Sequence, residues 1–100
     1  MIDWTRIKGF EWDSGNSRKS AEKHGVAQVE AEQVFFNEPL LVVADPKHAE
    51  GEARYHGLGH TDGGRRLHIT FTLRQDTTLI RVISAHDMSR KERARYEQEA

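Results

Sequence analysis

The sequence predicts an α+β domain in which helices at both ends of the chain flank an antiparallel meander sheet. Residues 66–74 alternate apolar and polar side chains, which is typical of a strand with one wet face. Residues 27–36 instead place apolar side chains at helical spacing. The apolar face of the sheet needs a cover, so we expect two N-terminal helices to pack on that face and leave the other face open.

The remaining elements follow from local signals. A short strand at 10–12 precedes helices at about 14–24 and 27–36; four strands then follow at 40–44, 53–60, 66–74 and 78–85. Thr61 to Gly64 forms a hairpin turn, and a turn at His86 and Asp87 leads into a last helix along one edge of the sheet. We expect one domain over residues 1–100, with residues 1–9 as a short N-terminal extension.

Composition excludes several classes of protein. The chain has no cysteine, which excludes disulfides and thiolate metal sites and fits a reducing cytoplasm. No apolar run approaches the roughly 20 residues of a membrane span, and the N-terminus lacks the apolar core of a signal peptide. We therefore expect a soluble, unexported protein that has no membrane partner.

The charge is unevenly distributed although the formal net charge is only -1. Residues 1–64 carry 7 Lys and Arg against 11 Asp and Glu, whereas residues 65–100 carry 8 against 5. Local field decides whether a phosphate is attracted, so the C-terminal third is the candidate surface for a polyanion. The acidic first half would face elsewhere or offset that field.

Strand and helix periods place the candidate residues. The open sheet face should present Arg54, His56, His68, Arg74 and Arg81, and the last helix should add Ser89, Glu92, Arg93 and Tyr96. Arg90 lies in the same basic run. A one-residue error in strand phase would move these strand side chains to the core face.

The residue types favour RNA chemistry that needs neither a metal nor another cofactor. His56 and His60 lie about 13 Å apart at about 3.3 Å per residue, too far to share an ion, and the sequence has no HExxH motif. Arginines can neutralise a pentavalent phosphate while a His, Lys, Tyr or Glu moves protons, and RNA supplies its own 2′-OH nucleophile. Each histidine also has a plain interpretation as a surface residue, and Lys23 and His24 as cations that end the first helix.

Five blocks of sequence resemble the BrnT family of bacterial type II toxins: EWD (11–13), KHGV (23–26), VFFNEPL (34–40), DPKHAEGEARY (45–55) and RVISAHDMSRKERARYE (81–97). The resemblance covers residues 10–97. It implies a RelE-like fold and an endoribonuclease that cuts RNA and arrests translation. It also implies a BrnA-like antitoxin, whose ribbon-helix-helix domain binds the operator DNA, in a two-to-two complex.

The family's basic constellation falls on Lys23, His24, Arg74, Arg81, Glu92, Arg93 and Tyr96. Many members have an arginine where this chain has His86, a group that titrates near neutral pH. Our hypothesis is that Arg81 and Arg74 hold the scissile phosphate. His86 or His24 is the first candidate for the group that carries the proton, and Tyr96 or Lys23 is the second. We expect further RNA contacts from Arg54, His68, Arg90 and Arg93.

Two other functions stay open at the level of sequence. The same face could be a non-catalytic surface that binds an antitoxin within a DNA-binding repressor complex. A stand-alone binder of single-stranded RNA is the other alternative, but it lacks the aromatic platform that such proteins use. Only Tyr55 and Tyr96 are placed to serve as one, and the apolar pattern favours a core position for Tyr55.

Overall fold

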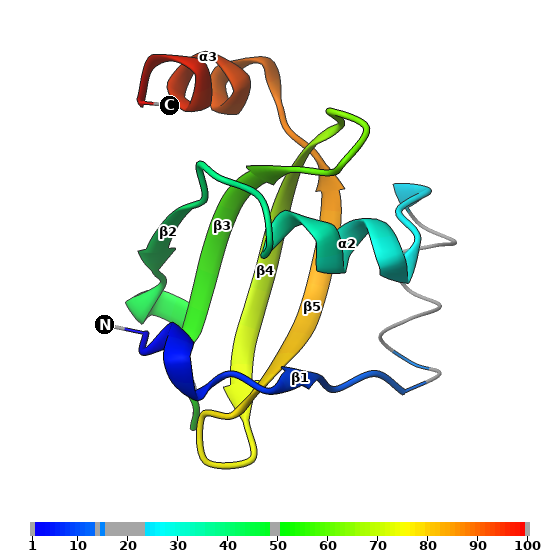
Figure 1. Cartoon of the computed structure of the whole chain (residues 1–100). Helices are drawn as coiled ribbons and strands as arrows, with labels where there is room; N and C mark the ends of the chain where they lie inside the picture. The colour runs from blue at the N-terminus through cyan, green and yellow to red at the C-terminus, as the bar shows by residue number, and fades with distance from the viewer. Residues whose placement is uncertain (1, 14, 16–23, 49–50, 100) are drawn as a thin grey trace.

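The computed structural model describes residues 2–13, 15, 24–48 and 51–99 (Figure 1). Its elements are η1 (Trp4–Arg6), β1 (Gly9–Phe10), α2 (Gln28–Val34), β2 (Leu41–Ala44), η2 (Pro46–His48), β3 (Arg54–His60), β4 (Arg66–Arg74), β5 (Leu79–Asp87) and α3 (Arg90–Glu99). The predicted helix at 14–24 lies almost wholly outside the described residues. Among those residues, no helix combines the length and apolar character needed to cross a bilayer.

The five strands form one sheet in the order β1-β5-β4-β3-β2. The four strands from β2 to β5 pair antiparallel with their neighbours, which confirms the predicted meander. The first strand differs, because β1 pairs with β5 in parallel, Phe10 opposite Ile80. The sheet is therefore mixed, and the prediction of a purely antiparallel sheet was wrong at this edge (Figure 1).

The core lies between α2 and one face of the sheet. Leu67, Ile69 and Phe71 of β4 are fully buried there, as the alternation predicted, and Val34 of α2 packs into the same cluster. Burying each such side chain contributes about 1.5–3 kcal/mol. Gly59 of β3 lets the helix approach closely, because a Cβ at this position would lie 2.6 Å from Val34 Cγ1.

A β-bulge changes the phase of β5. Phe71 pairs with Val82 and Thr70 pairs with Ser84, so Ile83 is an extra residue in the ladder. Such an insertion shifts every later side chain to the opposite face. Beyond it Ala85 is buried in the core, and His86 stands opposite His68 on the other face. The predicted turn at His86 was wrong, since β5 continues to Asp87.

The last helix begins with a capping box. Glu92 N–H donates to Ser89 Oγ at 3.1 Å, and Ser89 N–H donates to Glu92 Oε1 at 2.9 Å. α3 then packs over one end of the sheet through a second apolar cluster of Leu58, Met88 and Tyr96. Leu58 alternates with Gly57 and Gly59 along β3, so this cluster lies on the face opposite to α2.

Candidate functional site: an arginine pair and a histidine row

The sheet has a second face, on the side away from the core, which we call the open face. It is defined by Arg54, His56, His68, Arg81 and His86. It is less exposed than the sequence predicts. Thr70 and Thr72 of β4 lie on this face and are only 8% and 1% exposed. The prediction of a wet face was therefore wrong at these two positions in the middle of β4.

Two arginines converge at one end of the open face. Arg81 Nη1 lies 3.0 Å from Oε1 of Glu11, and Arg74 Nη1 lies 3.5 Å from the same oxygen. Arg81 also contacts Asp13 Oδ2 at 3.0 Å, and Arg74 Nε contacts Glu52 Oε2 at 2.9 Å. The predicted pairing of the two cations is thus present, and the two side chains point to a common position.

Carboxylates neutralise this arginine pair. Glu11 and Asp13 follow β1, which runs beside β5, and Glu52 comes from the segment before β3. The hydrogen bond that Arg74 donates to Glu52 is the main cause that raises the pKa of Arg74 above its ordinary value, with burial acting against it. The acidic half of the chain therefore offsets the field of the C-terminal third on this face.

Histidines occupy the other end of the open face. The ring centroids of His24 and His86 lie 5.5 Å apart, those of His86 and His68 lie 4.7 Å apart, and those of His68 and His56 lie 5.0 Å apart. We call these four residues the histidine row. Cross-strand pairing at the bulge-shifted register places His68 beside His86, and a histidine pair in contact is well suited to move protons.

Two carboxylates fix the rings of His56 and His68. Asp45 Oδ2 lies 2.7 Å from His56 Nε2, His56 Nδ1 lies 3.0 Å from His68 Nε2, and His68 Nδ1 lies 2.6 Å from Glu92 Oε2. The hydrogen bond with His56 is the main cause that lowers the pKa of Asp45 from 3.8 to about 2. Burial lowers the pKa of His68. Burial acts to raise the pKa of Glu92, but hydrogen bonding from Ser89 and the charge of His68 keep it below its ordinary value.

The ligand atoms of His68, His86 and Glu92 lie within 4.8 Å of one another. Two imidazoles and a carboxylate are ligands that divalent transition metals accept. The sequence-based exclusion of a metal rested on the spacing of His56 and His60 along one strand. It did not consider residues that a sheet register and a helix cap bring together.

Other predicted site residues lie elsewhere. Tyr96 is buried in the second apolar cluster, where its hydroxyl donates to Pro39 O at 2.6 Å and contacts His60 Nδ1 at 2.8 Å. Its side chain packs with Leu58 and Met88, and burial raises its pKa. Lys23 lies outside the described residues.

Three further arginines differ in their setting. Arg54 lines a hollow of about 290 Å³ on the open face together with Thr72 and Ile83. Arg90 and Arg93 are exposed on α3.

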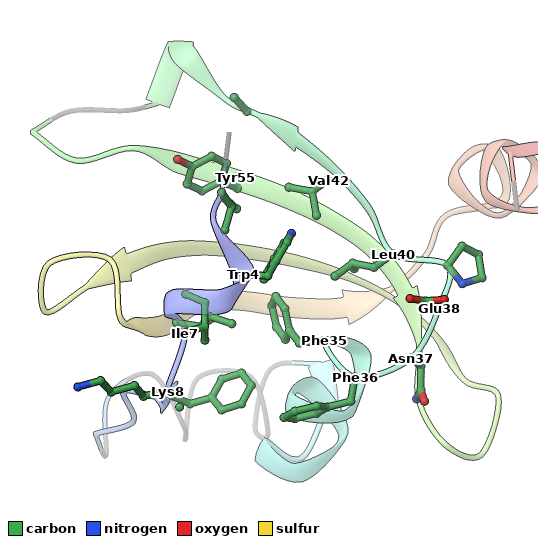
Figure 2. Close-up of a pocket in the computed structure, with 16 residues that line it drawn as sticks. Trp4, Ile7, Lys8, Phe35, Phe36, Asn37, Glu38, Leu40, Val42 and Tyr55 are labelled. Atoms are coloured by element: carbon green, nitrogen blue, oxygen red, sulfur yellow. The ribbon is translucent and has the colours of Figure 1, made fainter.

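A larger apolar hollow lies on the opposite face. Its volume is about 1170 Å³, and Figure 2 shows Trp4, Phe35, Leu40 and Tyr55 among the side chains that line it. Phe36 at its edge is 77% exposed. This mainly apolar lining is unsuited to a polyanion.

Comparison with known proteins decides the family. Residues 12–92 match the family described as the ribonuclease toxin BrnT of type II toxin-antitoxin systems. The chain belongs to the BrnT toxin family. It is therefore related to toxins that work with an antitoxin partner. No curated protein sequence matches it significantly.

The fold of this BrnT-family chain also matches a solved structure. The crystal structure of the Brucella abortus ribonuclease toxin BrnT has a TM-score of 0.59 and 19% sequence identity to it, and the match covers 84% of this chain and 100% of that one. At this identity the likeness concerns the fold, an α+β domain with a mixed sheet.

Sequence reasoning missed the acidic partners of this site. Glu11, Asp13 and Glu52 lie 22 to 70 positions from the arginines that they contact. Asp45 was likewise not singled out, although its contact with His56 spans only 11 positions. All four carboxylates fall within blocks that carry the family resemblance, which was the available signal: Glu11 and Asp13 in EWD, and Asp45 and Glu52 in DPKHAEGEARY.

Proposed function

We propose that this BrnT-family chain is a metal-independent endoribonuclease that cuts RNA by attack of the 2′-OH on the adjacent phosphodiester and thereby arrests translation. The observation that carries the proposal is the convergence of Arg74 and Arg81 on one carboxylate oxygen, on the same sheet face as the histidine row. Guanidinium groups bind carboxylate and phosphate oxygens with the same geometry. Glu11 Oε1 therefore stands where a phosphate oxygen of the substrate would lie.

The two ends of the open face suggest a division of roles. Arg81 and His86 are five residues apart on β5, on the order of 15 Å at about 3.3 Å per residue. This separation favours arginines that hold a phosphate next to the scissile one, which departs from the hypothesis drawn from the sequence. His86 and His24, whose rings adjoin, then carry the protons at the scissile phosphate.

The proposed complex contains an antitoxin. We propose a BrnA-like partner with a ribbon-helix-helix domain, in a two-to-two assembly that contacts operator DNA only through that partner. A RelE-like relationship of the fold is part of the same proposal. Co-expression of the chain with the product of an adjacent reading frame of this type, followed by measurement of the mass of the complex, tests this arrangement.

Cleavage of labelled RNA by the isolated chain tests the activity. With chelator present, the proposal expects cleavage that leaves a 2′,3′-cyclic phosphate. Arg81→Ala should lose cleavage and growth arrest while the far-UV circular dichroism stays unchanged. Arg6→Ala is the matched control, because Arg6 is not part of the open face. Its Nη2 lies 3.4 Å from Asp76 Oδ2 in an exposed ion pair. Full cleavage by Arg81→Ala would remove Arg81 from the site.

One observation favours a second function, a non-catalytic module that binds the antitoxin and acts in an autorepressor complex. The arginine pair is already occupied by the carboxylates of Glu11, Asp13 and Glu52, as in a structural ion-pair network. If the purified chain leaves RNA intact yet forms the antitoxin complex, this second function replaces the first.

A further inference from the structure

We propose that His68, His86 and Glu92 form a binding site for a divalent transition metal of the Zn²⁺ type. Their ligand atoms already lie within 4.8 Å of one another, on two adjacent strands and the first turn of α3. A site of two imidazoles and one carboxylate leaves a position for water or a fourth ligand. The site rests on contacts of the described residues and does not depend on ribonuclease activity.

The first argument is the setting of His86. Its Nδ1 lies 2.9 Å from the backbone oxygen of Asp87, so Nδ1 carries the proton that is donated to this carbonyl. Nε2 then has the free lone pair. Metal-binding histidines almost always donate their other N–H to a carbonyl or carboxylate in this way, which fixes both tautomer and ring orientation.

Glu92 is oriented by the cap of α3. Its Oε1 accepts from Ser89 N–H at 2.9 Å, which leaves Oε2 directed at His68 Nδ1, 2.6 Å away. The carboxylate is thus held by backbone on one oxygen and offers the other. A ligating carboxylate is usually supported by such a hydrogen bond.

His68 has the longest support. On the side of the His68 ring away from Nδ1, Nε2 contacts His56 Nδ1 at 3.0 Å. His56 Nε2 in turn contacts Asp45 Oδ2 at 2.7 Å. A divalent cation bound by His68 Nδ1 and Glu92 Oε2 would leave His68 Nε2–H to donate to His56 Nδ1 and His56 Nε2–H to donate to Asp45, so the contacts that orient His68 are compatible with the metal.

The ligand types select the metal class. Imidazole suits Zn²⁺, Co²⁺ and Ni²⁺, whereas Mg²⁺ prefers oxygen ligands and retains its water. The side chains of His68 and Glu92 are 16% and 27% exposed, so the site is partly shielded and still reachable from solvent. The ring of His24 adjoins that of His86, with their centroids 5.5 Å apart, but His24 is not among the three proposed ligands.

Calorimetric titration of the tag-free chain with Zn²⁺ tests the proposal, with Co²⁺ absorption reporting the ligands. The expected result is one ion per chain and no displacement by excess Mg²⁺. His86→Ala and Glu92→Gln should each weaken Zn²⁺ binding tenfold or more. Asp45→Asn should weaken it less, because Asp45 acts through His56 and His68. His48→Ala is the matched control, since His48 also contacts Asp45 but lies outside the three ligands.

Thermal unfolding without metal establishes that each variant is folded. If His86→Ala does not fold, Glu92→Gln decides alone, because its amide oxygen can still accept from Ser89 N–H. At the same Zn²⁺ concentration, the unfolding temperature of the wild type should rise more than that of Glu92→Gln, because the variant binds the ion more weakly. The proposal is overturned if the wild type fails to bind Zn²⁺, if the ligand variants bind it equally well, or if His48→Ala abolishes binding.

Discussion

Arg74 and Arg81 lie on adjacent strands, and both direct Nη1 at the same oxygen of Glu11, at 3.5 and 3.0 Å. The shared acceptor has two consequences. It holds two cations close together, which costs Coulomb energy unless an anion lies between them. It also means that a substrate phosphate must compete with a carboxylate of the chain itself.

The first prediction concerns this competition. Glu11→Gln keeps the shape of the side chain and removes its charge, so RNA should bind several-fold more tightly at low salt, because phosphate no longer displaces an anion. The affinity should also fall more steeply with salt concentration. Fluorescence anisotropy with a short labelled RNA measures both.

Glu38→Gln is a matched control, since Glu38 is an exposed carboxylate beside the apolar hollow rather than the arginine pair. If Glu11→Gln binds RNA no better than Glu38→Gln, the arginine pair is a structural network and not a phosphate site.

The second prediction concerns Arg65, which joins α2 to the end of β5. Its Nε lies 2.7 Å from Asp87 Oδ1, and its Nη1 lies 3.2 Å from Glu30 Oε2 and 3.0 Å from Gly25 O. The hydrogen bond to Asp87 is the main cause that raises the pKa of Arg65 and lowers that of Asp87. Arg65→Met should lower the free energy of unfolding by about 1.5–3 kcal/mol, as losing hydrogen bonds between charged groups does.

Urea denaturation measures this loss, and Arg6→Ala supplies the comparison. Arg6 forms one exposed pair, which is worth about 0–1 kcal/mol. If the two variants lose the same free energy of unfolding, the prediction that Arg65 stabilises the fold by joining α2 to β5 is contradicted.

The fold was predictable where the pattern was long. Residues 66–74 alternate over nine positions, and the buried Leu67, Ile69 and Phe71 confirm the phase. β5 was predictable only as far as Val82, because one extra residue at Ile83 reverses the faces and nothing local marks it. β1 has two residues, too few for a period to indicate its direction.

The candidate site was predictable in its cations and not in its anions. Arg74 and Arg81 lie on the open face, as strand alternation predicted. The carboxylate of Glu11 reaches them across 63 and 70 positions of sequence, through a parallel strand pair that no local signal specifies. His68 and His86 are neighbours only because of the bulge, so the proximity of their ligand atoms to Glu92 could not be predicted from the strand periods.

The third prediction concerns acid stability at Asp45. Its pKa in the folded chain is about 2, below the ordinary 3.8, because it accepts hydrogen bonds from His56 and His48. A carboxyl group with a lowered pKa contributes stability that is complete above its ordinary pKa and is lost as pH falls through the folded value. The wild type should therefore be more stable than Asp45→Asn at pH 5, and the difference should shrink between about pH 4 and pH 2.

Urea unfolding of both proteins at several pH values in this window measures the difference. Asp76→Asn is a suitable control, since Asp76 is almost fully exposed in its pair with Arg6. A difference for Asp45→Asn that is constant with pH would contradict a lowered pKa.

The last prediction joins the ribonuclease and metal proposals. If His86 carries a proton during cleavage, Zn²⁺ bound to its Nε2 removes the lone pair that this role requires, because a metal-bound nitrogen cannot accept a proton. RNA cleavage should be full in chelator, fall as one equivalent of Zn²⁺ is added, and recover when chelator is restored. Asp45→Asn should need several-fold more Zn²⁺ for half inhibition, since Asp45 supports His68 through His56. Cleavage that rises with Zn²⁺ would make the ion a cofactor and overturn the metal-independent mechanism, whereas cleavage unchanged by bound Zn²⁺ would remove His86 from proton transfer.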